Sequence, residues 1–213
     1  EAHAQEAHAQ EAHAQEAHAQ EAHAQEAHAQ EAHAQEGEFM KVYYATHSTT
    51  TDNEAALASG WNDVELSVVG QRQAEEVGRR FDSVPLDFVC VSDLGRAVDT
   101  ARIAFAGARP VLVDARLREI NYGDLNGAPR SEVDKLRIPS IYKPFPGGES
   151  YEEAMARTAD FYRELLGQRP DRTVLVIGHG VTHLTLRRLT SCRPIRELLE
   201  EPFVWQPVWE YDL

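Results

Sequence analysis

The sequence predicts an α/β domain over residues 40–213, a three-layer α/β/α sandwich with a mostly parallel central sheet. One observation predicts this fold class, and a second indicates where its site lies. Short, continuously apolar segments alternate with amphipathic segments, which is the pattern of parallel strands joined by helices. In addition, His47 and His179 each follow directly on an apolar segment. Ligands of open α/β sheets bind at the carboxyl ends of the strands, so we expect these two histidines to meet at one site.

Residues 1–39 are set apart from this domain. Residues 1–35 repeat Glu-Ala-His-Ala-Gln without a break, and a short linker leads from the repeat to Met40. We interpret residues 1–39 as an artificial histidine-containing tag and linker, and residues 40–213 as the natural domain. The alternative is a natural low-complexity arm that binds metal through its histidines. Outside the repeat, the only histidines are His47, His179 and His183.

The composition of the domain excludes several classes of partner. The domain carries 26 acidic and 21 basic residues once the acidic residues of the repeat and linker are set aside. A nucleic-acid surface needs a basic field, so we expect no nucleic acid partner. We also expect no membrane partner, because no apolar run reaches the length of a membrane span. Cys90 and Cys192 do not suggest a disulfide framework, and no signal peptide follows Met40, so the expected compartment is the cytoplasm.

The first half of the domain predicts two strand–helix pairs. Residues 41–45 are rich in Val and Tyr and predict a strand, which leads into a hydroxyl-rich turn at residues 46–51. Ser67 is the expected N-cap of a helix to residue 81, with Val69, Val77 and Phe81 on its apolar face. Residues 87–91 predict a second strand, and residues 94–105 predict a second helix.

The second half continues the alternation after one interruption. Residues 110–113 predict a third strand, but Gly and Pro are frequent in residues 117–148, which predict irregular structure. Ser150 is the expected cap of a helix to residue 166. Residues 173–177 predict a fully apolar strand, and Gly178, His179 and Gly180 turn it into a helix to residue 189. Residues 205–211 predict the last strand.

A set of short segments carries a more specific signal. They are Thr46-His47-Ser48-Thr49-Thr50 with Asn53, Ser59-Gly60-Trp61-Asn62-Asp63, Leu66-Ser67-Val68-Val69-Gly70, Ser92-Asp93-Leu94-Gly95-Arg96-Ala97, Leu117-Arg118-Glu119, Pro146-Gly147-Gly148-Glu149-Ser150 and Gly178-His179-Gly180. In this order they resemble the motifs of the histidine phosphatase (phosphoglycerate-mutase-like) family. The resemblance covers nearly all of residues 40–213, and the ordered set is far more specific than any one motif.

The resemblance implies a metal-independent phosphatase that acts on a small organic phosphate and needs no cofactor. His47 would attack phosphorus as a neutral imidazole and become a phosphohistidine. Glu119 would protonate the leaving oxygen and later activate water, while Arg96 and His179 hold the charge of the phosphoryl oxygens. The catalytic residues implied are therefore His47, Glu119, His179 and Arg96, and the substrate-binding residues implied are Thr46, Asn53, Ser59, Gly60, Arg96 and Gly180.

One residue departs from the family pattern. Thr46 stands where the family has the arginine before its first histidine, so a charge-assisted hydrogen bond worth about 1.5–3 kcal/mol is missing. Three interpretations stay open. Another cation, such as Lys143 or Arg118, compensates; the enzyme is slow or takes a different, even non-phosphate, substrate; or the domain has lost catalysis and only binds a ligand.

His179 and His183 form a His-x-x-x-His pair. Residues four apart lie on one helix face, and this spacing can bind zinc. No third ligand stands out in the sequence, and the family pattern accounts for His179 without a metal. We therefore expect no metal site.

Overall fold

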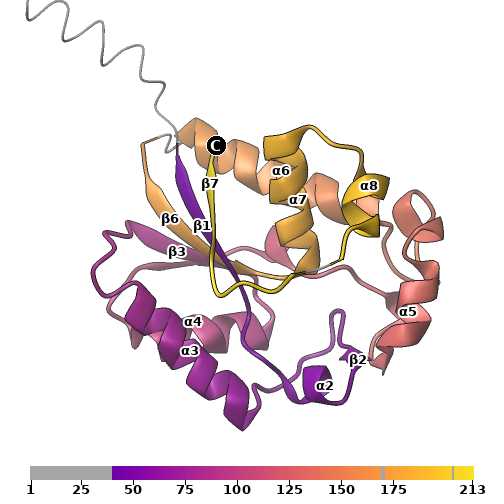
Figure 1. Cartoon of the computed structure of the whole chain (residues 1–213), viewed down its shortest axis with the longest axis horizontal. Coiled ribbons are helices and arrows are strands. Elements are labelled where there is room, and N and C mark those ends of the chain that lie inside the picture. Colours follow the sequence, from indigo (N-terminus) through magenta and orange to yellow (C-terminus); the bar gives the residue numbers. More distant parts are fainter. Residues whose placement is uncertain (1–39, 169–170, 203) are drawn as a thin grey trace, which may run out of the picture. The chain divides into compact units, whose positions relative to one another are not determined.

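The computed structural model describes residues 40–168, 171–202 and 204–213, so the predicted tag and linker at residues 1–39 lie outside the described residues. The domain is built on a five-stranded sheet in the order β4-β3-β6-β1-β7 (Figure 1). Strands β1, β3, β4 and β6 run parallel, and β7 is antiparallel to β1. The predicted, mostly parallel sheet is therefore confirmed. The strands are β1 (Lys41–Thr46), β3 (Phe88–Val91), β4 (Val111–Val113), β6 (Thr173–Gly178) and β7 (Trp209–Asp212).

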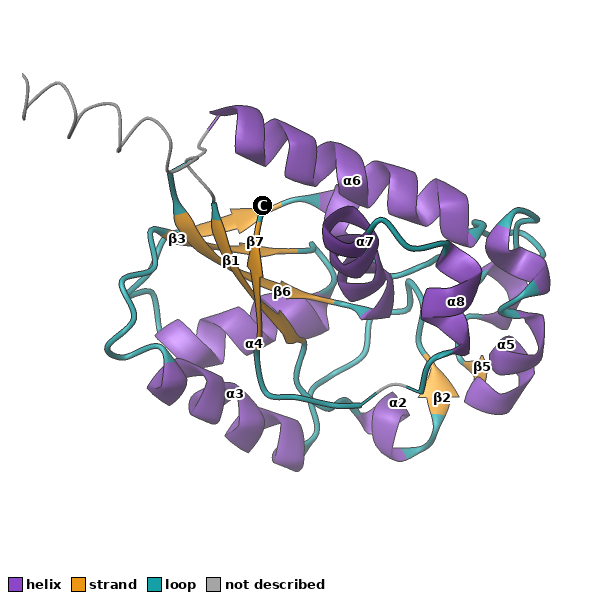
Figure 2. Ribbon diagram, turned by 45° about the horizontal axis from the view of Figure 1, so that its top comes forward, coloured by secondary structure: helices purple, strands orange, loops and turns teal. Residues whose placement is uncertain are grey.

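Helices cover both faces of this sheet (Figures 1 and 2). Helices α3 (Val68–Arg80) and α4 (Gly95–Phe105) pack on one face, and α6 (Tyr151–Gln168) and α7 (Gly180–Ser191) pack on the other. Successive strand residues point to opposite faces, so Val89 joins the core under α3 and α4 while Cys90 joins the core under α6. The three-layer α/β/α sandwich that the sequence predicts is confirmed.

Smaller elements lie at the end of the domain where the parallel strands finish (Figure 2). They surround a third apolar cluster, to which α5 contributes Val133 and α8 contributes Leu198. These elements are α2 (Thr51–Glu54), the paired strands β2 (Leu57–Ala58) and β5 (Ala128–Pro129), α5 (Arg130–Leu136), α8 (Ile195–Glu200), and 3-10 turns at Ala115–Leu117, Gly123–Leu125 and Pro139–Ile141. Their position places them around any ligand bound at the strand ends.

The predicted irregular structure at residues 117–148 is wrong in part, because α5 lies within that range. This helix has seven residues, of which only Val133 is buried, so it has no periodic apolar stripe that a sequence pattern could reveal. Helix α8 was not predicted either. The last strand begins at Trp209 rather than at residue 205, since Pro207 has no N–H for a strand ladder.

The boundaries of the other predicted strands and helices differ from the observed ones by at most two residues. Ser67 caps α3 as expected, since its side chain accepts a hydrogen bond from the Gly70 N–H. The predicted position of Val69 on the apolar face of this helix is wrong, because Val69 is 50% exposed and does not lie on the packed face of α3. Within the described residues, no helix combines the length and the apolar character needed to cross a bilayer.

Candidate active site

A cavity of about 450 Å³ lies at the carboxyl ends of the central strands. β1 ends at Thr46 and β6 ends at Gly178, and these two residues pair in register, so the residues that follow them are neighbours in space. The next residues are His47 and His179, whose ring centroids lie 5.1 Å apart. The sheet thus brings together two histidines that are far apart in the sequence, as the strand pattern led us to expect.

His47 borders this cavity, and each of its ring nitrogens has a hydrogen-bond partner. Its Nδ1 lies 2.8 Å from the Ser48 carbonyl oxygen, which can only accept, so Nδ1 carries the proton. Its Nε2 accepts a hydrogen bond from Arg96 Nε at 3.3 Å and is therefore the unprotonated nitrogen. Burial and the positive charge of Arg96 lower the pKa of His47 to about 3. His47 is consequently a neutral imidazole with a lone pair at Nε2, the form that a nucleophile needs.

Arg96 connects the two histidines. It is 2% exposed, and its Nη1 and Nη2 donate to the carbonyl oxygens of Asn62 and Gly60 at 3.1 and 2.8 Å. Nη2 also lies 3.5 Å from His179 Nδ1, and His179 Nε2 lies 2.7 Å from Ser92 Oγ. Burial, Arg96 and His47 keep the pKa of His179 well below its usual value. His179 is therefore neutral and fixed by bonds at both nitrogens.

Glu119 follows the 3-10 turn at Ala115–Leu117, and its side chain lies beside the first turn of α7. Its carboxylate oxygens accept hydrogen bonds from the N–H groups of Ile120, Gly180 and Val181 at 2.9, 3.0 and 3.3 Å. A Cβ atom at residue 180 would meet Glu119 Oε2 at 3.3 Å, so a glycine there permits this close approach. The helix start thus orients Glu119 as a hydrogen-bond acceptor beside the cavity.

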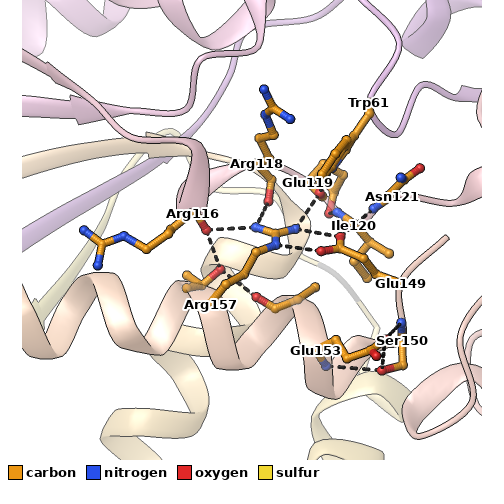
Figure 3. A network of polar contacts seen from close by, with 12 residues as sticks. Trp61, Arg116, Arg118, Glu119, Ile120, Asn121, Glu149, Ser150, Glu153 and Arg157 are labelled. Atoms are coloured by element: carbon orange, nitrogen blue, oxygen red, sulfur yellow. Dashed lines mark hydrogen bonds and ion pairs between the residues drawn. The ribbon is translucent and has the colours of Figure 1, made fainter.

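A network centred on Arg157 of α6 holds the Glu119 loop (Figure 3). Arg157 Nη1 and Nη2 donate to the carbonyl oxygens of Arg116, Arg118 and Glu119 at 2.8, 2.7 and 2.8 Å. The Arg157 guanidinium also pairs with Glu149 of the Pro-Gly-Gly-Glu-Ser segment at 2.9 Å. Three carbonyl groups of the loop are therefore fixed by one half-buried cation, and the position of Glu119 depends on it.

The remaining predicted site residues also border the cavity: Thr46, Asn53, Ser59, Gly60 and Gly180. The Asn53 side-chain oxygen accepts the Thr50 N–H and caps α2, which leaves its amide nitrogen for a ligand. Gly60 has φ +54°, and a Cβ atom there would lie 1.8 Å from Asn126 Oδ1, so only glycine fits. The structure thus gathers every residue that the motifs implied, and Thr46 faces the cavity with a short, uncharged hydroxyl.

The two cations suggested as replacements for the missing arginine do not line this cavity. Arg118 pairs with Asp93 and lies over the Trp61 ring at 4.5 Å, and Lys143 is exposed on the following loop. Besides Arg96, the arginines that line it are Arg130 and Arg137 of the α5 region and Arg187 of α7. The sequence reasoning missed them. The one available signal was the spacing of Arg130 and Arg137 by two helical turns, in a segment predicted to be irregular.

The two histidines of the His-x-x-x-His pair have different partners. His179 is bonded to Ser92 and Arg96, whereas His183 Nε2 lies 2.7 Å from the Tyr211 hydroxyl and its ring stacks on Tyr44. Among the described residues, no group of three metal-binding side chains lies together. This pair thus offers no ready-made zinc site within the described part of the chain.

Acid should destabilise the domain through its buried histidines. Burial lowers the pKa of His183 to about 4 and that of His47 to about 3, and it also lowers the pKa of His179. Unfolded histidines titrate near 6.5, so between that pH and about 4 the unfolded chain binds more protons than the folded one. Their contribution to stability is present above pH 6.5 and is lost as the pH falls. The free energy of unfolding should decrease by about 1.4 kcal/mol per pH unit for each histidine.

Urea unfolding at pH 7, 6 and 5 measures this dependence. In the variant His183→Gln, the free energy of unfolding should depend less steeply on pH, by the amount expected for about one proton, whatever its stability at pH 7. An unfolding free energy that stays constant between pH 7 and pH 5 would contradict the assignment of these histidines as neutral.

Comparison with known proteins agrees with this arrangement. Residues 42–201 match the family model described as histidine phosphatase superfamily (branch 1). Phosphoglycerate mutase-like protein 4 of Arabidopsis thaliana is 30% identical over 177 residues, which cover 76% of each chain.

Solved structures are similar over most of the fold. YhfR of Bacillus stearothermophilus superposes with a TM-score of 0.71 at 27% identity, covering 79% of this chain and 90% of its own. A mycobacterial glucosyl-3-phosphoglycerate phosphatase superposes with a TM-score of 0.66 at 27% identity, covering 76% of this chain and 84% of its own. Both mutase-like and phosphatase relatives therefore share this architecture.

Proposed function

We propose that this chain, which belongs to branch 1 of the histidine phosphatase superfamily, hydrolyses a small organic phosphomonoester through a phosphohistidine at His47. The observation that carries the proposal is the neutral imidazole of His47, which lines one cavity together with Arg96, His179 and Glu119 and whose unprotonated Nε2 accepts from Arg96. Relatives named as phosphatases support the reaction class.

The proposed reaction has two steps. The first step starts with Glu119 in its protonated form. His47 Nε2 forms a bond to phosphorus as the bond from phosphorus to the leaving oxygen breaks, and Glu119 gives its carboxyl proton to that oxygen. Water then loses a proton to Glu119 and attacks the phosphohistidine, which releases inorganic phosphate and neutral His47. Arg96 and His179 stabilise charge on the phosphoryl oxygens in both steps. These groups do so without a metal or a cofactor.

The phosphoryl group should pass from His47 to water, as in a phosphatase, rather than to a phosphoglycerate, as in a mutase. The family's cofactor-dependent mutases carry a long insertion between the Glu loop and the Pro-Gly-Gly-Glu-Ser segment, and it helps to exclude water. Here the segment from Glu119 to Pro146 is short and contains only β5, α5 and two 3-10 turns. With 3-phosphoglycerate as the test compound, we expect phosphate release to exceed formation of 2-phosphoglycerate. Isomerisation faster than phosphate release would show a mutase instead.

The experiment that tests the proposed function is hydrolysis of an aryl phosphate in the presence of EDTA. Wild-type protein should release phosphate at a rate that EDTA does not change. The His47→Ala variant should release no phosphate. Equal rates in the two proteins would remove His47 as the nucleophile, and a rate abolished by EDTA would contradict the metal-independent mechanism.

We also propose that the protein works in the cytoplasm on a small-molecule substrate. Cys90 is buried and Cys192 is exposed, and neither forms a disulfide, which suits a reducing compartment. The cavity volume of about 450 Å³ is in the usual range for small-molecule sites.

A further inference from the structure

The cavity has one charge fewer at its phosphate end than the family motif provides. Thr46 stands beside His47 with a neutral hydroxyl, and Arg96 divides its donors between two backbone carbonyls and the two histidines. A phosphomonoester brings nearly two negative charges into this space. Since most of its surroundings are buried, an uncompensated charge would be costly there. A second cation is therefore required from another element.

Helix α5 supplies cations to the opposite wall of the cavity. Arg130, Val133, Asp134 and Arg137 all line it, with the i, i+3, i+4, i+7 spacing of one helix face. Val133 is 3% exposed and anchors this face in the apolar cluster. The start of the helix is fixed as well, because the Arg130 N–H donates to the Ala56 carbonyl oxygen at 2.9 Å. The face that carries both arginines is thus held toward the cavity.

The two arginines lie at different ends of this face. Seven residues of helix correspond to about 10 Å along the axis. Arg130 is bonded to Ala56 directly before β2, and β2 leads to Gly60, which accepts a hydrogen bond from Arg96. The charge of Arg130 also contributes to the lowered pKa of His47, whereas Arg137 lies at the far end of the helix, where its charge acts on Tyr151. Arg130 therefore lies at the end of this helix face that is nearer to His47.

Arg130 also has its guanidinium available. Within the described residues, no carboxylate or hydrogen-bond acceptor is bonded to it, whereas Arg187, which also lines the cavity, pairs with Glu201. An arginine that faces a cavity without a protein partner has five N–H donors free for a ligand, in a fork that fits phosphate oxygens.

We propose that Arg130 binds the phosphoryl group of the substrate and supplies, from α5, the charge that Thr46 does not. This proposal rests on the proposed function, and it selects compensation among the explanations for the missing arginine. It also identifies the compensating residue as neither Lys143 nor Arg118, both of which lie outside the cavity lining.

The first test compares Arg130→Gln with Lys143→Gln, a matched loss of one positive charge outside the cavity. With an aryl phosphate, Arg130→Gln should lose about 10- to 100-fold in kcat/KM, the size expected for one charge-assisted hydrogen bond. Calorimetric binding of inorganic phosphate should weaken by a similar factor. Lys143→Gln should change neither quantity by more than about twofold, and Arg137→Gln should weaken phosphate binding less than Arg130→Gln.

The second test separates phosphate contact from a structural role. Thr46→Arg should restore most of the lost activity when it is added to Arg130→Gln, but it should add little to the wild-type protein. A structural defect at α5 would not be repaired by a charge on β1.

The outcomes distinguish the two proposals. If His47→Ala abolishes hydrolysis while Arg130→Gln keeps wild-type kcat/KM and wild-type phosphate affinity, the role of Arg130 is wrong and the proposed function stands. If wild-type protein neither hydrolyses the aryl phosphate nor binds phosphate, both proposals fail. Thr46→Arg that raises wild-type activity tenfold or more would also overturn the role of Arg130, because the missing charge would then be uncompensated.

Discussion

His47→Ala is expected to lower kcat for an aryl phosphate by about 10⁴-fold or more, with little change in the urea midpoint. The loss should be this large because His47 is held as a neutral imidazole with its lone pair at Nε2, by the Ser48 carbonyl on one side and Arg96 on the other. His179 should not replace it, because His179 is 1% exposed whereas His47 is only partly buried at the cavity. Stopped assays of phosphate release give the rate.

The matched comparison is His183→Asn. His183 borders the same cavity, but it is bonded to Tyr211 and not to Arg96. It should therefore keep kcat within about tenfold of wild type, since it takes no part in the transfer. Comparable losses in the two variants would indicate that any disturbance of the cavity stops hydrolysis, and the specific role of His47 would have to be given up.

Arg157→Met should reduce the free energy of unfolding by about 3–5 kcal/mol. The guanidinium of Arg157 and the carboxylate of Glu149 are 18% and 20% exposed, so removal of the cation leaves a largely buried carboxylate without its partner. It also removes the donors to the carbonyl oxygens of the Glu119 loop. Because the loop carries Glu119, kcat should fall in the same variant. Urea unfolding and aryl phosphate kinetics measure the two effects.

Arg163→Met on the same helix is the control. Arg163 is 65% exposed and pairs with Asp160 at the surface, so its loss should change stability by no more than about 0.5 kcal/mol. Adding Glu149→Gln to Arg157→Met should recover part of the loss, since no buried charge then remains unpaired. If Arg157→Met costs less than about 1 kcal/mol, the network of Figure 3 does not hold the loop as described.

The sequence predicts the sheet and the position of the site well, because both depend on local patterns. The apolar runs that become β1 and β6 are unambiguous, and the rule that ligands bind at the ends of parallel strands places His47 beside His179. The family motifs then name the residues that follow other elements, such as Arg96 at the start of α4. The structure adds what no pattern contains, namely that Nε2 is the unprotonated nitrogen of His47.

The wall of the cavity opposite the strands was not predictable in the same way. Helix α5 has seven residues and begins directly after Pro129, so the sequence pattern did not reveal a helix that would direct its arginines toward the cavity. Trp205 was expected in a strand, but it is exposed and lines the cavity from a loop. These residues come from elements that owe their positions to tertiary packing around Val133 and Leu198 rather than to local propensity.

Trapping the phosphoenzyme tests the central claim most directly. Wild-type protein and His47→Ala would be mixed with an aryl phosphate in EDTA, quenched within the first turnovers, and digested under alkaline conditions that preserve phosphohistidine. The account predicts that the peptide containing His47 gains one phosphoryl group in the wild-type protein, that the modification is lost on acid treatment, and that His47→Ala shows none. Rapid hydrolysis by the wild-type protein with the phosphoryl group on another residue, or with no phosphorylated peptide at any quench time, would contradict it.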